Sequence, residues 1–309
     1  GSSAPKGGLW DTPLGAVGNA AGNIPITALG AAFGGAGAEA PKGKLSPEEL
    51  VHPGTGPYPA HYTTDPSLPD KTIYAPMTPP PASVKMPVIV WGEGGCFKTG
   101  TFYAPFLIEL ASHGYVILAN GPPTGSPPTT MADMGKLMQT PQTKVSDLLD
   151  SIDWVVKGGG KKFGSLDLER IATAGQSCGG TEALSAAYKN DKVKLTFLVN
   201  SGTLNAEARP WLREFKYPVG IFNGGPKDIA YANGVADYEV LQLPAFMANL
   251  DTGHGGTLFA KNGGKFGKAV SSFLEWTFRG DQKSKAICLD PKAPGSLVSE
   301  NWNVSAKGW

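Results

Sequence analysis

A serine flanked by small residues lies in the pentapeptide GQSCG, residues 175–179. An apolar run, residues 170–174, precedes it, and a helix-like run, residues 180–188, follows it. A Gly-x-Ser-x-Gly pattern between a strand and a helix is typical of a sharp turn that presents a nucleophilic serine. Small residues two positions before and after the serine are needed because the turn brings two backbones close together. The same pentapeptide also occurs as an ordinary small-residue turn, so the rest of the chain must supply partners for Ser177.

Alternating apolar and amphipathic runs around this turn predict an α/β fold with a doubly wound, mostly parallel sheet. The run VIVW at residues 88–91 is typical of a strand buried on both faces of such a sheet. Further strands are expected at residues 115–119, 195–199, 219–222 and 243–247, and helices at 101–113, 143–157 and about 267–279. Ligands of such sheets bind at the carboxyl ends of the strands, where the connecting loops gather.

The N-terminal part of the chain reads differently. Residues 58–63 and 71–75 predict two strands of an antiparallel hairpin, joined by a turn-rich segment. Residues 1–50 are rich in Gly and Ala and nearly uncharged, and apolar residues such as Trp10 and Phe33 favour an arm packed along the domain. Residues 51–309 contain no repeat or second core, so we expect a single domain there.

Composition and charge narrow the classes of partner that this protein could bind. The net charge is +1, from 27 Lys and Arg against 26 Asp and Glu, without a basic cluster, which argues against nucleic acid or an anionic membrane as the main partner. No run of eighteen apolar residues predicts a membrane span. The 42 Gly, 27 Pro and 17% charged residues favour a secreted protein, where the sequon at residues 303–305 could be glycosylated. The oligomeric state stays open.

A serine hydroxyl needs a base to accept its proton, and in this kind of sheet the acid and the histidine follow the serine in the chain. His254, in the segment DTGHGG, is the only histidine after Ser177. Asp228 ends the loop that leaves the strand at residues 219–222, which places it beside the histidine loop. Asp237 and then Asp251 are the alternatives for the acid.

The oxyanion of an acyl-transfer intermediate needs hydrogen-bond donors. The backbone N–H of Cys178, the residue after the serine, is one expected donor, and the glycine-rich loop at residues 91–97 is expected to supply the other. That loop lacks the patterns of a phosphate cradle, and no residues have the spacing of a zinc site, so no cofactor and no metal are expected.

Three cysteines leave at least one unpaired within the chain. Cys96 and Cys178 lie in two loops that are both expected to face the reaction centre. A disulfide between them and two half-buried free thiols are both consistent with the sequence.

These residues resemble the α/β-hydrolases, in particular the branch of dienelactone hydrolases and cutinase-like bacterial polyester hydrolases. The similarity runs from about residue 56 to about residue 288, and its best markers are ASHGY at 111–115, FGSLD at 163–167, the segment 175–180 and GHG at 253–255. It implies that residues 51–309 form an α/β-hydrolase catalytic domain, that Cys96 and Cys178 give the oxyanion donors, and that Asp228 is the acid. The chain departs from the polyester hydrolases at Gln176, in the loop 200–204, where an aromatic clamp would be expected, and at Cys288, which has no later cysteine to pair with.

The sequence therefore predicts a serine carboxylic-ester hydrolase that acts on a small-molecule or polymeric ester through Ser177, His254 and Asp228. One alternative is a lactonase, thioesterase or acyltransferase with the same three residues. Another is a catalytically silent binding protein that retains the fold. Pocket walls could come from residues that also suit a core: Trp91, Phe97, Trp211, Tyr231 and the loop 121–128.

Overall fold

The computed structural model of this chain describes residues 52–123, 132, 136, 139 and 141–309. The predicted arm, residues 1–50, and most of the loop 121–128 lie outside the described residues. Within them the strands are β1 (Ala60–Thr63), β2 (Lys71–Pro76), β3 (Met86–Gly92), β4 (Val116–Asn120), β5 (Leu166–Gln176), β6 (Val193–Val199), β7 (Val219–Asn223), β8 (Ala245–Asn249) and β9 (Asn303–Lys307). The helices are α4 (Ala104–Ser112), α6 (Val145–Val156), α7 (Cys178–Ala187), α8 (Tyr231–Val240), α9 (Gly264–Arg279) and α10 (Gln282–Leu289). Short 3-10 helices include η2 (Gly94–Cys96) and η4 (Arg209–Glu214).

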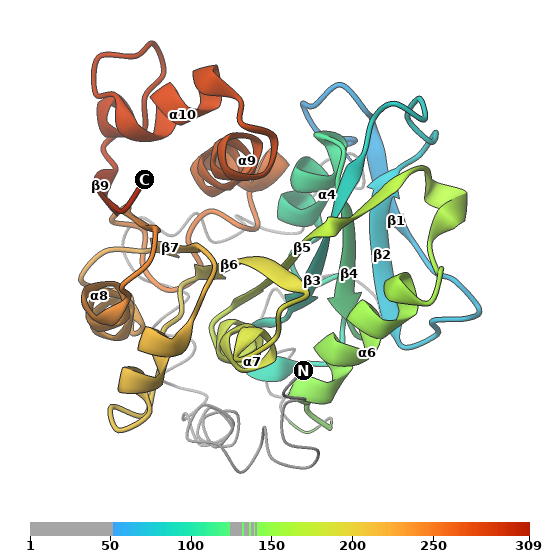
Figure 1. Cartoon of the computed structure of the whole chain (residues 1–309), viewed down its shortest axis with the longest axis horizontal. Coiled ribbons are helices and arrows are strands. Elements are labelled where there is room, and N and C mark those ends of the chain that lie inside the picture. The colour runs from blue at the N-terminus through green and yellow to red at the C-terminus, as the bar shows by residue number, and fades with distance from the viewer. Residues whose placement is uncertain (1–51, 124–131, 133–135, 137–138, 140) are drawn as a thin grey trace.

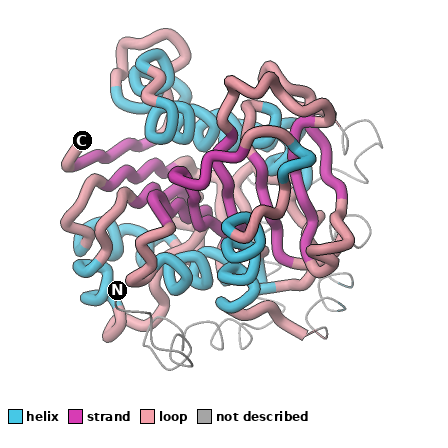
Figure 2. Tube along the Cα trace, turned by 45° about the vertical axis from the view of Figure 1, so that its right-hand side comes forward, coloured by secondary structure: helices cyan, strands magenta, loops and turns pink. Residues whose placement is uncertain are grey.

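The described strands form a nine-stranded sheet in the order β1-β2-β4-β3-β5-β6-β7-β8-β9. Strands β4, β3, β5, β6, β7 and β8 run parallel to one another, whereas β1 pairs antiparallel with β2, β2 with β4, and β9 with β8. Figure 2 shows the strand nearest the C-terminus at one edge of this sheet. The predicted α/β class and the mostly parallel sheet are confirmed.

Helices cover both faces of the sheet. In Figure 1, α4, α9 and α10 lie above the sheet and α6, α7 and α8 lie below it. Strand β3 serves both layers, because Ile89 and Trp91 enter the core under α4 and α9 while Val88 and Val90 enter the core under α6 and α7. This period of two explains why the strand reads as one continuous apolar run.

The order of the strands places a switch point between β3 and β5. From β3 the chain crosses to β4 on one side, and it then returns to β5 on the other side of β3. A crevice opens at the carboxyl ends of the strands where the order reverses, because the two following loops leave in opposite directions. The two loops here are the glycine-rich loop after β3 and the GQSCG turn after β5.

Three described elements were not predicted from the sequence: α8, α10 and β9. Helix α8 contains Gly234 and buries only two of its residues, and α10 buries only Cys288, so neither has a clear apolar face. Strand β9, with the sequence NVSAK, is a half-exposed edge strand, and its only apolar residues, Val304 and Ala306, make too short an alternation to predict a strand. In the described part of the chain, no helix has both the length and the apolarity to cross a membrane.

Candidate active site

Ser177 lies at the junction of β5 and α7 with a strained backbone. Its φ of 52° and ψ of −118° are unfavourable for a residue with a side chain. A Cβ atom on Gly175 would overlap the backbone of Gly179, and one on Gly179 would overlap the backbone of Gly92. The glycines on either side of the serine are therefore required by the close approach of β3, β5 and α7.

The three predicted side chains meet in one hydrogen-bonded series. Nε2 of His254 lies 2.8 Å from Oγ of Ser177, and its Nδ1 lies 2.7 Å from Oδ1 of Asp228. The serine is half-buried, whereas His254 and Asp228 are 1% and 3% exposed. A serine proton can pass to the imidazole in this arrangement, while the carboxylate holds the opposite ring nitrogen.

Asp228 is held as a carboxylate by its surroundings. Its Oδ2 accepts hydrogen bonds from Nδ2 of Asn200 and from the N–H of Gly224, each at 2.8 Å, and its Oδ1 also accepts the N–H of Ala230. Burial by itself would raise the pKa of Asp228, but the hydrogen bond and charge of His254 and the bonds from Asn200 and Ala230 outweigh it and hold the pKa below its ordinary value. The carboxylate is thus ready to stabilise a protonated imidazole.

The alternative acids lie elsewhere in the network. Asp237 of α8 bonds to Nε of Arg209 at 3.0 Å and to the N–H of Thr203 at 2.7 Å, so it supports the loop after β6. Burial raises the pKa of Asp237 to about 6, against the opposing effect of these hydrogen bonds and of the Arg209 charge. Asp251 is exposed at the start of the histidine loop. Among the three candidates, Asp228 is the one bonded to His254.

The N–H groups of the two predicted oxyanion donors differ in their hydrogen bonding. Cys178 is the first residue of α7, so its N–H has no acceptor within the helix. The N–H of Cys96, in contrast, donates to the carbonyl of Glu93 at 3.0 Å and closes the tight turn of η2. An oxyanion bound by both groups would share the Cys96 N–H with Glu93, as three-centre hydrogen bonds allow.

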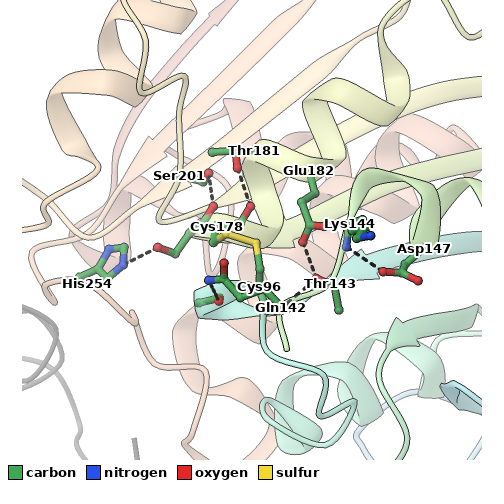
Figure 3. The surroundings of a disulfide bond; sticks show 12 residues. Cys96, Gln142, Thr143, Lys144, Asp147, Cys178, Thr181, Glu182, Ser201 and His254 are labelled. Carbon is green, nitrogen blue, oxygen red and sulfur yellow. Dashed lines mark hydrogen bonds between the residues drawn. A yellow bond between two sulfur atoms is a disulfide. The ribbon is translucent and has the colours of Figure 1, made fainter. Parts of the chain in front are cut away.

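A disulfide joins Cys96 to Cys178, with their Cα atoms 5.3 Å apart (Figure 3). Both cysteines are buried, so the bond ties the loop after β3 to the start of α7 from within. Free half-buried thiols, the other interpretation of the sequence, are therefore not what the structure contains. Cys288 is a buried free thiol, and burial raises its pKa to about 12.

The side chains considered as pocket walls differ in how deeply they are buried. Trp91 and Phe97 are buried in the core under α4, and Trp91 packs against Tyr103 and Phe106. Trp211 and Tyr231 are half-buried. Trp91 is therefore a core residue and does not line the site.

Gln176, the residue before the serine, also points away from the serine side chain. Its side chain is fully buried, and its Oε1 accepts the hydroxyl of Tyr103 at 2.5 Å. A Cβ on Gly94 would overlap this Oε1, so the glutamine packs against the glycine-rich loop after β3.

Two further residues of the site were missed in the sequence. Asn200 has a φ of 47° directly after β6, and its Nδ2 contacts both Oδ2 of Asp228 and, at 3.3 Å, the carbonyl of Gly253 beside the histidine. Oγ of Ser201 donates to the carbonyl of Ser177 at 2.7 Å. The available signal was their place at the carboxyl end of a strand next to β5.

One group of side chains combines sulfur and oxygen atoms. Cys96, Cys178 and Glu182 offer ligand atoms within 4.8 Å of one another. The two sulfurs are bonded to each other and cannot act as thiolates, so this group does not fit a metal ion in its disulfide form.

Comparisons with known proteins give no family for this chain: no family model matches it, and a search of curated proteins finds no match.

Proposed function

We propose that this protein is a serine carboxylic-ester hydrolase with an α/β-hydrolase fold. The observation that carries the proposal is the hydrogen-bonded series Ser177–His254–Asp228, with 2.8 Å between serine and histidine and 2.7 Å between histidine and aspartate. The strained turn at Ser177 and the chain order serine, aspartate, histidine also support this fold.

In the proposed reaction, Oγ of Ser177 attacks the acyl carbon and its proton passes to Nε2 of His254. The resulting oxyanion is stabilised by the N–H groups of Cys178 and Cys96. The tetrahedral intermediate then expels the alcohol, which takes the proton from His254 and leaves an acyl group on Ser177. A water molecule then gives a proton to His254 and attacks this ester, and the acid is released as the proton returns from His254 to Oγ of Ser177.

Asp228 orients His254 and stabilises its charged form without taking the proton, because the hydrogen bonds around this carboxylate hold its pKa low. No step in this sequence calls for a redox or carrier cofactor. The same chemistry would serve a lactone or a thioester, and an alcohol in place of water would give acyl transfer.

Hydrolysis of p-nitrophenyl esters tests the proposal. We expect the wild-type protein to release p-nitrophenolate, and Ser177→Ala to lose this activity while its circular dichroism spectrum is unchanged. Ser185→Ala, a change in the body of α7, is the matched control and should retain activity. Turnover by Ser177→Ala equal to wild type would reject the proposal. If the wild-type protein is active, esters of different acyl length would rank its substrates.

A further inference from the structure

Residues Gln142 and Thr143, just before α6, contact the glycine-rich loop at residues 91–97, called the oxyanion loop below (Figure 3). Nε2 of Gln142 donates to the carbonyl of Gly95 at 3.0 Å. The N–H and Oγ1 of Thr143 lie 2.8 Å and 3.2 Å from the carbonyl of Cys96. A single antiparallel bridge between Phe97 and Gln142 extends the same contact. Two successive carbonyls of the loop are thus held by two successive residues 47 positions away.

The Gly95 carbonyl belongs to the same peptide group as the N–H of Cys96. A trans peptide is planar, with its C=O and N–H on opposite sides, so a bond that fixes the carbonyl also fixes the direction of the N–H. The described residues contain no cis peptide bond. Gln142 therefore helps to set where the Cys96 N–H points, together with the bond from that N–H to the carbonyl of Glu93, although its own side chain is one peptide plane away from that hydrogen.

This peptide group needs support because the backbone of Cys96 is strained. Gly95 adopts its φ of 65° freely, but Cys96 carries a side chain and has a φ of 53°. Such a conformation persists only when surrounding contacts hold it. The disulfide fixes the Cys96 side chain, Gln142 fixes the carbonyl before it and Thr143 fixes the carbonyl after it.

Glu182 of α7 supports Thr143 from behind. Its Oε1 lies 2.8 Å from Oγ1 of Thr143, and its side chain is 1% exposed. Burial, the largest effect, raises the pKa of Glu182 to about 8, so this carboxyl carries a proton at neutral pH. Oγ1 of Thr143 donates to this Oε1, and the same hydroxyl also lies within hydrogen-bond distance of the Cys96 carbonyl.

We propose that Gln142 is a positioning residue for the oxyanion hole: its amide orients the Gly95–Cys96 peptide so that the Cys96 N–H meets the developing oxyanion. This inference rests on the proposed ester-hydrolase function. Gln142 touches neither the substrate carbonyl nor Ser177 in this role and acts through the peptide group that it holds.

The test compares Gln142→Met, which keeps the length of the side chain and removes the donor, with Gln282→Met. Gln282 also donates to a glycine carbonyl, that of Gly280, but on the exposed turn between α9 and α10. Both variants are measured with a carboxylic ester and with the matching thionoester, whose sulfur is a poor acceptor for oxyanion-hole donors. Melting temperatures are recorded alongside.

We expect Gln142→Met to lower kcat for the oxygen ester by about tenfold to hundredfold, less than complete loss of a donor, with KM within about twofold. The preference for the oxygen ester over the thionoester should fall by a similar factor, while Gln282→Met stays at the wild-type value. Gln142→Glu, which also lacks the donor at neutral pH, should repeat the defect and covers the case that the Met variant does not fold.

A wild-type kcat and a wild-type ester preference in a folded Gln142 variant would overturn the inference. Equal loss on both esters together with a lower melting temperature would also overturn it, since that pattern is a general structural defect. Failure of the proposed function gives a different result, because the wild-type protein itself would then hydrolyse neither ester.

Discussion

The disulfide between Cys96 and Cys178 joins the two backbone segments that carry the proposed oxyanion donors, across 82 residues of sequence. The bond is buried beside Glu182 and Thr143, and the half-buried Ser177 directly precedes one of its cysteines. Its covalent tie keeps the loop after β3 and the start of α7 at a fixed separation. The distance between the two donors is therefore set by a bond and does not depend on packing alone.

Replacing both cysteines by serine should lower stability and activity together. A disulfide that closes a loop of this length contributes about 4.5 kcal/mol in the chain-entropy model, so urea unfolding should show a loss of that order. The kcat for ester hydrolysis should fall because the donors are no longer held together. Cys288→Ser, which alters a buried thiol outside the site, is the control for cysteine removal. Unchanged kcat and unchanged unfolding free energy in the double variant would contradict this role.

Asn200→Ala should reduce kcat about tenfold or more with little change in KM, because the amide that joins Asp228 to the histidine loop is lost. Asn200→Asp should be worse, since it places a second carboxylate against Asp228. Steady-state kinetics with one ester measures both. Asn205→Ala, in the same connection but bonded only to the local N–H of Glu207, should remain near wild type. A normal kcat in Asn200→Asp would show that Asp228 does not need this support.

The raised pKa of Glu182 predicts that the free energy of unfolding depends on pH. Burial raises its pKa from 4.5 to about 8, the nearby Asp147 adds to the rise, and the Thr143 hydrogen bond and the Lys71 charge oppose it. Between these values the folded protein binds a proton that the unfolded chain has released, so stability should fall as pH rises from about 4.5 to about 8. Urea unfolding at several pH values measures this slope.

Glu182→Gln keeps a neutral side chain of the same shape and should flatten the dependence of unfolding free energy on pH in that window. Glu169→Gln, an exposed carboxyl on β5, is the control and should leave the slope unchanged. A Glu182→Gln variant with the full wild-type slope would mean that other groups, such as Asp237, carry the effect.

The sequence was most informative where few residues could fill a position. His254 is the one histidine after Ser177, and Asp228 follows a strand next to the histidine strand, so both were found from order and spacing. The parallel sheet followed from runs such as VIVW, in which burial on both faces leaves a signal in every residue.

Asn200, Ser201 and Gln142 could not be found in this way. Each acts through one or two hydrogen bonds to segments between 24 and 53 residues away, and such contacts depend on how the loops turn after their strands. Elements with little burial, such as β9 and α8, also left only a weak apolar pattern. The unpredicted part of the site is thus the part built from tertiary hydrogen bonds.

The central claim is that Ser177 is an activated nucleophile, and reaction with a fluorophosphonate tests it most directly. Intact mass measurement should show one added phosphonyl group, and peptide mapping should place it on Ser177. His254→Ala should react far more slowly, because the base that takes the serine proton is gone. A folded wild-type protein that forms no adduct at Ser177 would contradict the claim and favour a binding protein that retains the fold.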